Sequence, residues 1–157
     1  MKSISNPIEH SHPVDVAFGG KALNHWQQGV LDSLREYGSQ KPFRKCDVSM
    51  LDLSAITAIT GDEFAMFTRG GERLIVRGEN ERVPINVRKA EELREAGYRW
   101  SGHTHPGITD ASLVVSDGDR KILIAFKQGR SSLYNASGRH ALVTTEVYNY
   151  ELGSKKR

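Results

Sequence analysis

Residues 98–106 read Tyr98-Arg99-Trp100-Ser101-Gly102-His103-Thr104-His105-Pro106, and after a loop the chain continues with Ser116-Asp117-Gly118-Asp119. Side chains two residues apart on a strand share a face, so His103 and His105 can present their imidazole nitrogens to one cation. Asp119 would add a carboxylate and leave a fourth position open for water, which is typical of a catalytic rather than a structural zinc site. The stretch therefore predicts a strand that leads into a helix, with a hydrolytic metal site between the two elements.

Length, cysteine content and charge limit the possible classes of protein. The 157 residues fit a single domain, large enough to bury about two-thirds of its unfolded surface. The single cysteine, Cys46, excludes an intrachain disulfide and any Cys-x-x-Cys metal cluster, and indicates a reducing compartment. Residues 1–20 lack an apolar signal-peptide core, and the longest apolar run, Ile122–Phe126, is too short to span a bilayer. The net charge of +3 comes without a long basic tract, so we interpret the positive charge as a solvated basic face.

The pattern along the chain predicts one α/β (α+β) domain between an arm and a tail. We expect residues 1–20 to form an N-terminal arm or linker, residues 21–150 the domain and residues 151–157 a C-terminal tail. Apolar spacing and capping residues predict helices over 24–37, 88–96 and 117–128. Short apolar or alternating runs predict strands over 64–68, 74–77, 83–87, 98–105, 132–135 and 140–147, with hairpins around Arg69-Gly70-Gly71 and Ala136-Ser137-Gly138.

A second informative segment lies upstream, at the start of the first predicted hairpin. It reads Gly61-Asp62-Glu63-Phe64-Ala65-Met66-Phe67. Together with the His-x-His-Pro and the Ser-x-x-Asp at a helix start, this segment resembles the JAMM/MPN metalloproteases, a family of zinc peptidases and isopeptidases, and its bacterial members in particular. The resemblance runs from about Glu63 to Tyr134. It implies a mixed β-sheet flanked by helices.

The resemblance implies a role for five residues. His103, His105 and Asp119 would bind one zinc ion (Zn2+) per chain. Glu63 would accept a proton from the activated water and pass it to the leaving amine, and Ser116 would help to stabilise the oxyanion. The implied function is a zinc-dependent metallohydrolase, a metalloprotease or isopeptidase that cleaves peptide or isopeptide bonds.

These residues also have structural interpretations. Ser116-x-x-Asp119 at a helix start is a capping box, which needs no metal. The two histidines can be buried hydrogen-bonded side chains, and Glu63 can be a surface carboxylate at a strand start. The loop of residues 106–115 is longer than in the family, and its conformation is left open. A similar motif, His10-Ser11-His12-Pro13, lacks the flanking strand and acid, so we interpret it as part of the arm.

Other chemistries fit the residues less well. A zinc deaminase needs His-x-Glu and Pro-Cys-x-x-Cys, which do not occur in the sequence. Amidohydrolase barrels also use His-x-His, but a closed barrel needs about 250 residues. An iron site with Asp110 as third ligand would require an all-β barrel, which the predicted helices disfavour. A non-catalytic MPN-like interaction scaffold and a metal-dependent nuclease effector stay as alternatives, and the competent residues at all five positions favour the peptidase.

Partners and location follow from this interpretation. The expected partner is a protein or peptide substrate, and a ubiquitin-like protein and an immunity or inhibitor protein are further candidates. We expect no membrane partner and no nucleic-acid partner. The expected site of action is the cytoplasm. Some bacterial domains of the resembled type are phage-associated and others are toxin tips of larger secreted proteins, so delivery as part of such a protein is a further expectation by analogy.

Overall fold

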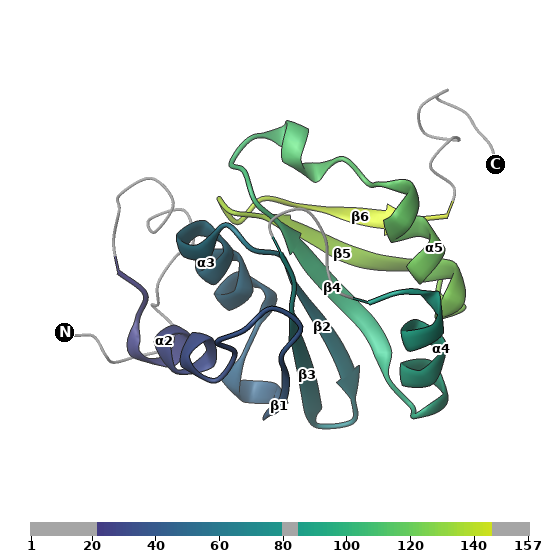
Figure 1. The fold of residues 1–157 in the computed structure, drawn as a ribbon. Coiled ribbons are helices and arrows are strands. Elements are labelled where there is room, and N and C mark those ends of the chain that lie inside the picture. Colours follow the sequence, from purple (N-terminus) through teal and green to yellow (C-terminus); the bar gives the residue numbers. More distant parts are fainter. Residues whose placement is uncertain (1–21, 80–84, 146–157) are drawn as a thin grey trace.

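A mixed sheet forms the centre of the computed structural model, which describes residues 22–79 and 85–145. The strands are β1 (Gln40–Arg44), β2 (Phe64–Arg69), β3 (Glu72–Arg77), β4 (Arg99–His105), β5 (Arg130–Asn135) and β6 (His140–Thr144). Their order across the sheet is β1-β3-β2-β4-β5-β6 (Figure 1). The β4–β5 pair is parallel, and the other neighbouring pairs are antiparallel. This architecture confirms the predicted α/β (α+β) class.

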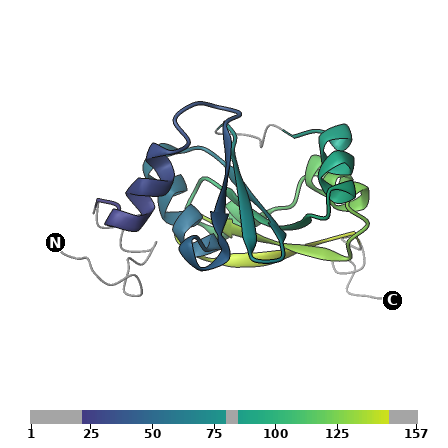
Figure 2. The same cartoon turned by 90° about the horizontal axis from the view of Figure 1, so that it is seen from below.

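Helices cover both faces of this sheet. They are α2 (His25–Asp32), α3 (Met50–Thr60), α4 (Val87–Glu95) and α5 (Asp117–Ala125), joined by the short 3-10 helices η2 (Lys45–Asp47) and η3 (Asp110–Leu113). The pair α2 and α3 lies on one side of the strands, and the pair α4 and α5 lies on the other (Figure 1, Figure 2). Within the described ranges, no helix combines the length and apolarity that crossing a bilayer would require.

The alternation of side chains along β2 explains the two helical layers. Phe64 and Met66 pack into the cluster beneath α2 and α3, whereas Ala65 and Phe67 pack into the cluster beneath α4 and α5. All four side chains are buried, because β2 is a central strand with a helical layer on each face. The larger members of the second cluster include Leu93, Trp100, Leu123 and Phe126. A rigid, two-sided sheet therefore supports the end of β4, where the paired histidines lie.

Several predicted elements form close to their predicted bounds. The β2–β3 hairpin turns at Arg69-Gly70-Gly71, where Gly70 has φ of 58°. The helix predicted over 88–96 is α4, and Gly97 follows it with φ of 97°, a conformation that favours glycine. The strand predicted over 98–105 is β4. The last hairpin, β5–β6, is also present, and residue 147 at its predicted end lies outside the described residues.

Other predicted elements are wrong in extent or type. The helix predicted over 24–37 ends at Asp32, and Tyr37 is exposed on the surface. The helix predicted over 117–128 ends at Ala125. The strand predicted over 83–87 is contradicted at its described end: the Asn86 side chain accepts a hydrogen bond from the N–H of Lys89 at 2.9 Å, so Asn86 caps a helix that begins at Val87. Residues 83 and 84, like the predicted arm and tail, lie outside the described residues.

Two elements have no counterpart among the predicted ones. Helix α3 buries the consecutive residues Leu53, Ser54, Ala55, Ile56 and Thr57, so its apolar pattern does not repeat with a helical period. A capping box between Ser49 and Asp52 nevertheless marks its start. Strand β1 is a largely exposed edge strand that contains Pro42, which an edge tolerates because one side of its backbone is unpaired.

Candidate metal centre

The paired histidines lie at the end of β4, between the residue that precedes β2 and the start of α5. Ala65 on β2 pairs with His103 on β4 in an antiparallel sense. Continuing that register by two residues places Glu63 opposite His105. The intervening Thr104 points to the other face, where its hydroxyl shares a hydrogen bond with a threonine of α3 at 2.6 Å. Strand alternation and register therefore direct both histidines and Glu63 to the same place.

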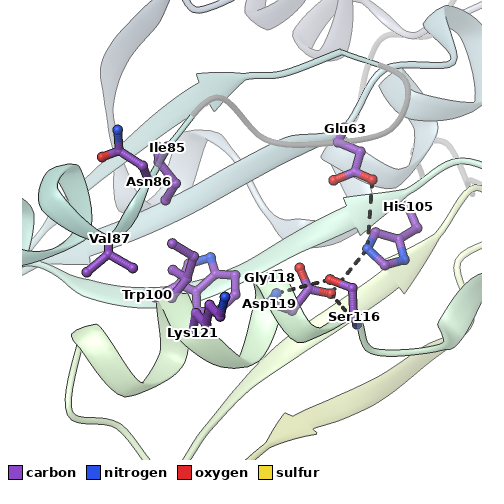
Figure 3. A pocket seen from close by; sticks show the side chains of 11 residues that line it. Glu63, Ile85, Asn86, Val87, Trp100, His105, Ser116, Gly118, Asp119 and Lys121 are labelled. Atoms are coloured by element: carbon purple, nitrogen blue, oxygen red, sulfur yellow. Dashed lines mark hydrogen bonds and ion pairs between the residues drawn. The ribbon is translucent and has the colours of Figure 1, made fainter.

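Four side chains meet at this point, and Figure 3 shows three of them, Glu63, His105 and Asp119. The Nε2 atoms of His103 and His105 lie 3.2 Å apart. Asp119 contacts both rings, with its Oδ1 atom 3.1 Å from Nε2 of His103 and its Oδ2 atom 3.5 Å from Nε2 of His105. The Oε2 atom of Glu63 lies 3.8 Å from Nε2 of His105, and Figure 3 shows its carboxylate pointing toward the same nitrogen as Asp119. Four of the five predicted site residues are thus brought together.

The spacing of these donor atoms suits one metal ion. Glu63, His103 and His105 each offer one donor atom, and these atoms lie within 4.8 Å of one another. Two ligands bound at about 2.0–2.1 Å from a tetrahedral zinc ion lie roughly 3.3 Å from each other. The separations between the histidines, and between each histidine and Asp119, are close to that value, whereas Glu63 is farther from His105. The group of Glu63, His103 and His105 could therefore hold a metal ion, and Asp119 lies beside both histidines through its two carboxylate oxygens.

Groups behind the histidines fix how their rings are turned. The Nδ1 atom of His105 lies 3.1 Å from the carbonyl oxygen of Ser112, so Nδ1–H donates to that carbonyl and the lone pair on Nε2 is left for a ligand. His103 is completely buried and stacks on the Trp100 ring, with centroids 5.0 Å apart and an interplanar angle of 28°. Among the described residues, Nδ1 of His103 has no hydrogen-bond partner. Packing against Trp100 on one side and the contacts of Nε2 with Asp119 and His105 on the other therefore hold this ring.

Ser116 and Asp119 form the capping box that their spacing predicts. The N–H of Ser116 donates to Oδ2 of Asp119 at 3.1 Å, and the N–H of Asp119 donates to Oγ of Ser116 at 3.0 Å. The structural interpretation of this motif is therefore confirmed. It does not compete with metal binding, because the cap holds one carboxylate oxygen while the other faces His103. The cap also uses the Ser116 hydroxyl as an acceptor, so it does not consume the hydroxyl proton.

Burial and charge set the protonation of the ligands. Burial would raise the pKa of Asp119, but hydrogen bonds with His103 and His105 outweigh it and hold that pKa far below its usual range. Burial lowers the pKa of His103, and the hydrogen bond to Asp119 opposes this only in part. Burial would also lower the pKa of His105, but Asp119 and Glu63 together raise it above its ordinary value. An ionised Asp119 and a neutral His103 are the forms that bind cations.

The structure shows how the longer loop of residues 106–115 is folded. Its second half forms η3, which brings the Ser112 carbonyl to His105. Buried Asn135, at the end of β5, donates from Nδ2 to the carbonyl of Thr109 at 3.0 Å. The Oδ1 atom of Asn135 accepts three hydrogen bonds from the turn that follows it. The loop is therefore fastened to the β5–β6 turn, and this fastening sets the orientation of a metal-site histidine.

Asp110 does not take part in the site. Its carboxylate pairs with Arg139 at 2.7 Å, and both side chains are mostly exposed. The alternative in which Asp110 is the third ligand of an iron site is therefore wrong.

An open cavity adjoins the four side chains. Its volume is about 390 Å³, and it reaches Glu63, His105, Ser116 and Asp119. Figure 3 shows the other end of this cavity, where Ile85, Asn86, Val87, Trp100 and Lys121 are drawn. Ser116, the fifth predicted site residue, thus lies on the wall of the cavity beside the donor atoms. A small molecule or part of a chain can therefore reach the Glu63 carboxylate and the donor atoms together.

The sequence did not reveal several residues that shape the site. The roles of Ser112 and Asn135 depend on the fold of a loop, and only the turn signal at Ala136-Ser137-Gly138 pointed to that region. Trp100 belongs both to the core and to the cavity wall. Lys121 carried no signal, because its position on the cavity follows from how the fold places α5 beside α4.

Comparisons with known proteins give no match. No protein-family model matches the sequence, and neither the search of curated proteins nor the search of solved structures finds a match. The resemblance to the JAMM/MPN family therefore stays a prediction, which depends on the five residues and their geometry.

Proposed function

We propose that this protein is a metal-dependent hydrolase that cleaves amide bonds in peptides or proteins, with zinc as its metal. The observation that carries the proposal is the convergence of His103, His105 and Asp119. The two Nε2 atoms lie 3.2 Å apart, and Asp119 places Oδ1 3.1 Å from His103 and Oδ2 3.5 Å from His105, separations close to those between ligands of a tetrahedral zinc ion. Three protein ligands leave one position open, as catalytic rather than structural sites do. The adjoining cavity supplies access to that position.

The Glu63 carboxylate is the group suited to move protons. When bound, zinc acts as a Lewis acid toward an amide carbonyl and lowers the pKa of water to about 7. Glu63 is buried, lies 3.8 Å from Nε2 of His105 and also lines the cavity. From this place its carboxylate accepts a proton from the attacking water and delivers it to the nitrogen of the leaving amine.

Ser116 is the group suited to stabilise developing negative charge. Its hydroxyl lies at the N-cap of α5, on the cavity wall, and its proton is not used by the helix cap. From there it donates a hydrogen bond to the carbonyl oxygen as that oxygen becomes anionic. The positive end of the α5 dipole adds to this stabilisation.

Metal content tests the site independently of any substrate. Purified protein incubated with zinc and then dialysed should hold one zinc ion per chain by elemental analysis. The His103→Ala/His105→Ala variant should hold almost none, whereas the matched control His140→Ala, which changes an exposed histidine on β6, should hold the normal amount. Full zinc content in the double variant would contradict the proposed ligands.

Cleavage tests the reaction. The zinc-loaded protein should hydrolyse amide bonds in a complex peptide mixture, a chelator should abolish the hydrolysis, and stoichiometric zinc should restore it. Identification of the products by mass spectrometry gives the cleaved bonds. Metal-dependent cleavage of DNA or RNA without any peptide cleavage would support the nuclease alternative. One bound zinc ion with no cleavage of either polymer would support the scaffold alternative.

A further inference from the structure

The cavity beside the metal centre has an apolar inner part. Its walls away from the donor atoms come from the residues that precede α4 and open it, from β4 and from α5. The apolar side chains among them are Ile85, Val87, Trp100 and Ile122. Trp100 is almost fully buried. Val87 is a large apolar residue that is 40% exposed, so part of this apolar wall faces solvent. An apolar group that entered from the donor atoms would find a preformed apolar contact surface.

The size of the cavity limits what can occupy it. Its volume of about 390 Å³ lies at the low end of the roughly 300–1,000 Å³ that ligand pockets span. Such a space accommodates one large side chain and the backbone next to it, and not a folded domain. An aromatic side chain gains most from a site of this kind, because it has a large apolar area and loses little conformational entropy.

A second hollow continues from the first along the groove between α4 and α5. The two share Val87 and Lys121, and the second has a volume of about 320 Å³. Three cationic side chains line it, Arg94, Lys121 and Lys127, against one carboxylate, that of Glu91. In the part of the chain that the structure describes, the buried Nε atom of Arg94 has no hydrogen-bond partner. The surface just beyond the apolar cavity is therefore complementary to an anion.

We propose that these two hollows select the substrate of the hydrolase proposed above, on which this inference rests. The cavity binds a large apolar side chain next to the scissile amide, with aromatic residues preferred. Lys121 and the basic hollow bind a carboxylate that follows one or two residues further along. The substrate is thus an extended, acidic peptide segment with an aromatic residue at the cleavage site. The carboxylate comes either from Asp or Glu or from a chain terminus, and the two sources share the same chemistry.

Binding to metal-free protein tests this recognition without turnover. The probe is the blocked peptide acetyl-Gly-Glu-Gly-Phe-Gly-Glu-Gly-amide, whose symmetric frame makes the direction of binding irrelevant. Three companions replace the central Phe by Gly, both Glu by Gln, or both together. Titration calorimetry on chelator-treated protein should show binding of the Phe/Glu peptide at least tenfold tighter than any companion. A further peptide has Gln in place of Glu and a free carboxyl end two residues after Phe, and it separates the two carboxylate sources. Tight binding would show that the basic hollow recognises a chain terminus, and weak binding that it recognises an acidic side chain.

Variants at exposed positions assign each preference to its hollow. In Lys121→Glu, the ratio of the affinities for the Glu and Gln peptides should fall at least fivefold, and the preference for Phe over Gly should stay the same. Val87→Trp places a bulky ring where the two hollows meet, so it should reduce the preference for Phe over Gly and keep the preference for Glu over Gln. The matched controls Lys45→Glu and Ile59→Trp make the same exchanges at exposed positions that line neither hollow, and should change neither preference. The inference would be overturned if the Phe/Glu peptide and its three companions bound equally, or if Lys121→Glu and Lys45→Glu had equal effects.

The same peptides offered to zinc-loaded protein separate the failure of this inference from the failure of the proposed reaction. Cleavage next to Phe, fastest in the Phe/Glu peptide, supports both. Selective binding without cleavage supports the recognition and contradicts the hydrolase. Cleavage of all four peptides at equal rates supports the hydrolase and contradicts the recognition.

Discussion

At the scale of single residues, the two carboxylates beside the histidines have different surroundings. Asp119 contacts both rings and is held by a helix cap, whereas Glu63 lies at the longer distance of 3.8 Å from Nε2 of His105 and lines the cavity. A ligand requires fixed geometry, and a proton carrier requires access to water and substrate. This difference is the basis for assigning Asp119 to the metal and Glu63 to proton transfer.

The variant Glu63→Gln should retain one zinc ion per chain but lose turnover by about 10²–10⁴-fold, because the amide has nearly the same shape and cannot accept a proton. Steady-state kinetics together with elemental analysis checks both parts. Glu36→Gln changes an exposed glutamate far from the site and serves as the control. If Glu63→Gln instead loses its zinc, Glu63 is a ligand and the triad with His103 and His105 is the metal site.

Ser116→Ala should reduce turnover about 10²-fold, since removal of an oxyanion donor has an effect of that order. It should also reduce the free energy of unfolding by about 1 kcal/mol through loss of the helix cap. Ser49→Ala removes the equivalent cap of α3, distant from the site, and should cause a similar loss of stability with normal turnover. Denaturant unfolding and kinetics on both variants separate the two effects. Equal turnover in Ser49→Ala and Ser116→Ala would mean that Ser116 only caps the helix.

Zinc affinity should decrease as the pH falls. His105 must lose its proton before it binds a metal, and its pKa lies above the ordinary value of about 6.5. Asp119 stays ionised because its pKa is lowered, and His103 stays neutral because its pKa is also lowered. Below the pKa of His105, affinity should therefore fall about tenfold per pH unit, as expected for one competing proton. Competition with a chelator dye between pH 8 and pH 5.5 measures it, and a flat profile would contradict the role of His105.

At the scale of elements, the loop of residues 106–115 acts on the site through its fastening to the β5–β6 turn. Asn135→Ala removes one donated and three accepted hydrogen bonds at a buried position, so it should reduce the free energy of unfolding by about 1–3 kcal/mol. Because the loop places the Ser112 carbonyl on His105, zinc affinity should also fall about 10–100-fold. Chemical unfolding and zinc competition measure the two effects. Asn24→Ala, which uncaps α2, should affect stability alone.

The elements that could be predicted from the sequence are those with a local signal. The β2–β3 hairpin has a Gly-Gly turn, α4 has a glycine after its end, and α5 has a Ser-x-x-Asp start. The missed α3 is buried along consecutive residues, so periodicity gave no sign of it. The run 83–87 resembled a strand in composition, but the Asn86 side chain accepts a hydrogen bond from the N–H of Lys89 and caps a helix that begins at Val87. Local patterns thus fix an element unless a cap or a tertiary contact overrides them.

The same distinction holds for the candidate site. His103 and His105 were predicted to share a face because their spacing on a strand alone determines it. The spacing of Ser116 and Asp119 likewise predicted that they form a capping box. The position of Glu63 opposite His105 depends on the register of β2 with β4, which only the motif pattern suggested. Ser112, Asn135 and Lys121 could not be predicted, because their places depend on how segments distant in sequence pack together.

At the scale of the whole molecule, a metal held by residues of β4 and α5 should stabilise the fold. A ligand that binds only the folded state adds about 2.7 kcal/mol at a free concentration of about 100 times its Kd. For a chain of this length, that corresponds to an increase in Tm of roughly 5–10 °C. Thermal unfolding with and without zinc checks the shift. It should vanish in His103→Ala and persist in His140→Ala, and an equal shift in both variants would place the zinc elsewhere.

Because β4 and β5 run parallel, the chain between them must pass over a face of the sheet before the two strands can pair. Pairings of this kind form late, since the entropy of closing the connection is lost before its contacts are gained. His103 and His105 precede this connection and Asp119 lies within it, so the three donors meet only after it has closed. We expect these contacts to form after the folding transition state, so an ion bound there would stabilise the folded state and not the transition state. It would therefore lengthen the lifetime of the folded protein without shortening the time the chain needs to fold.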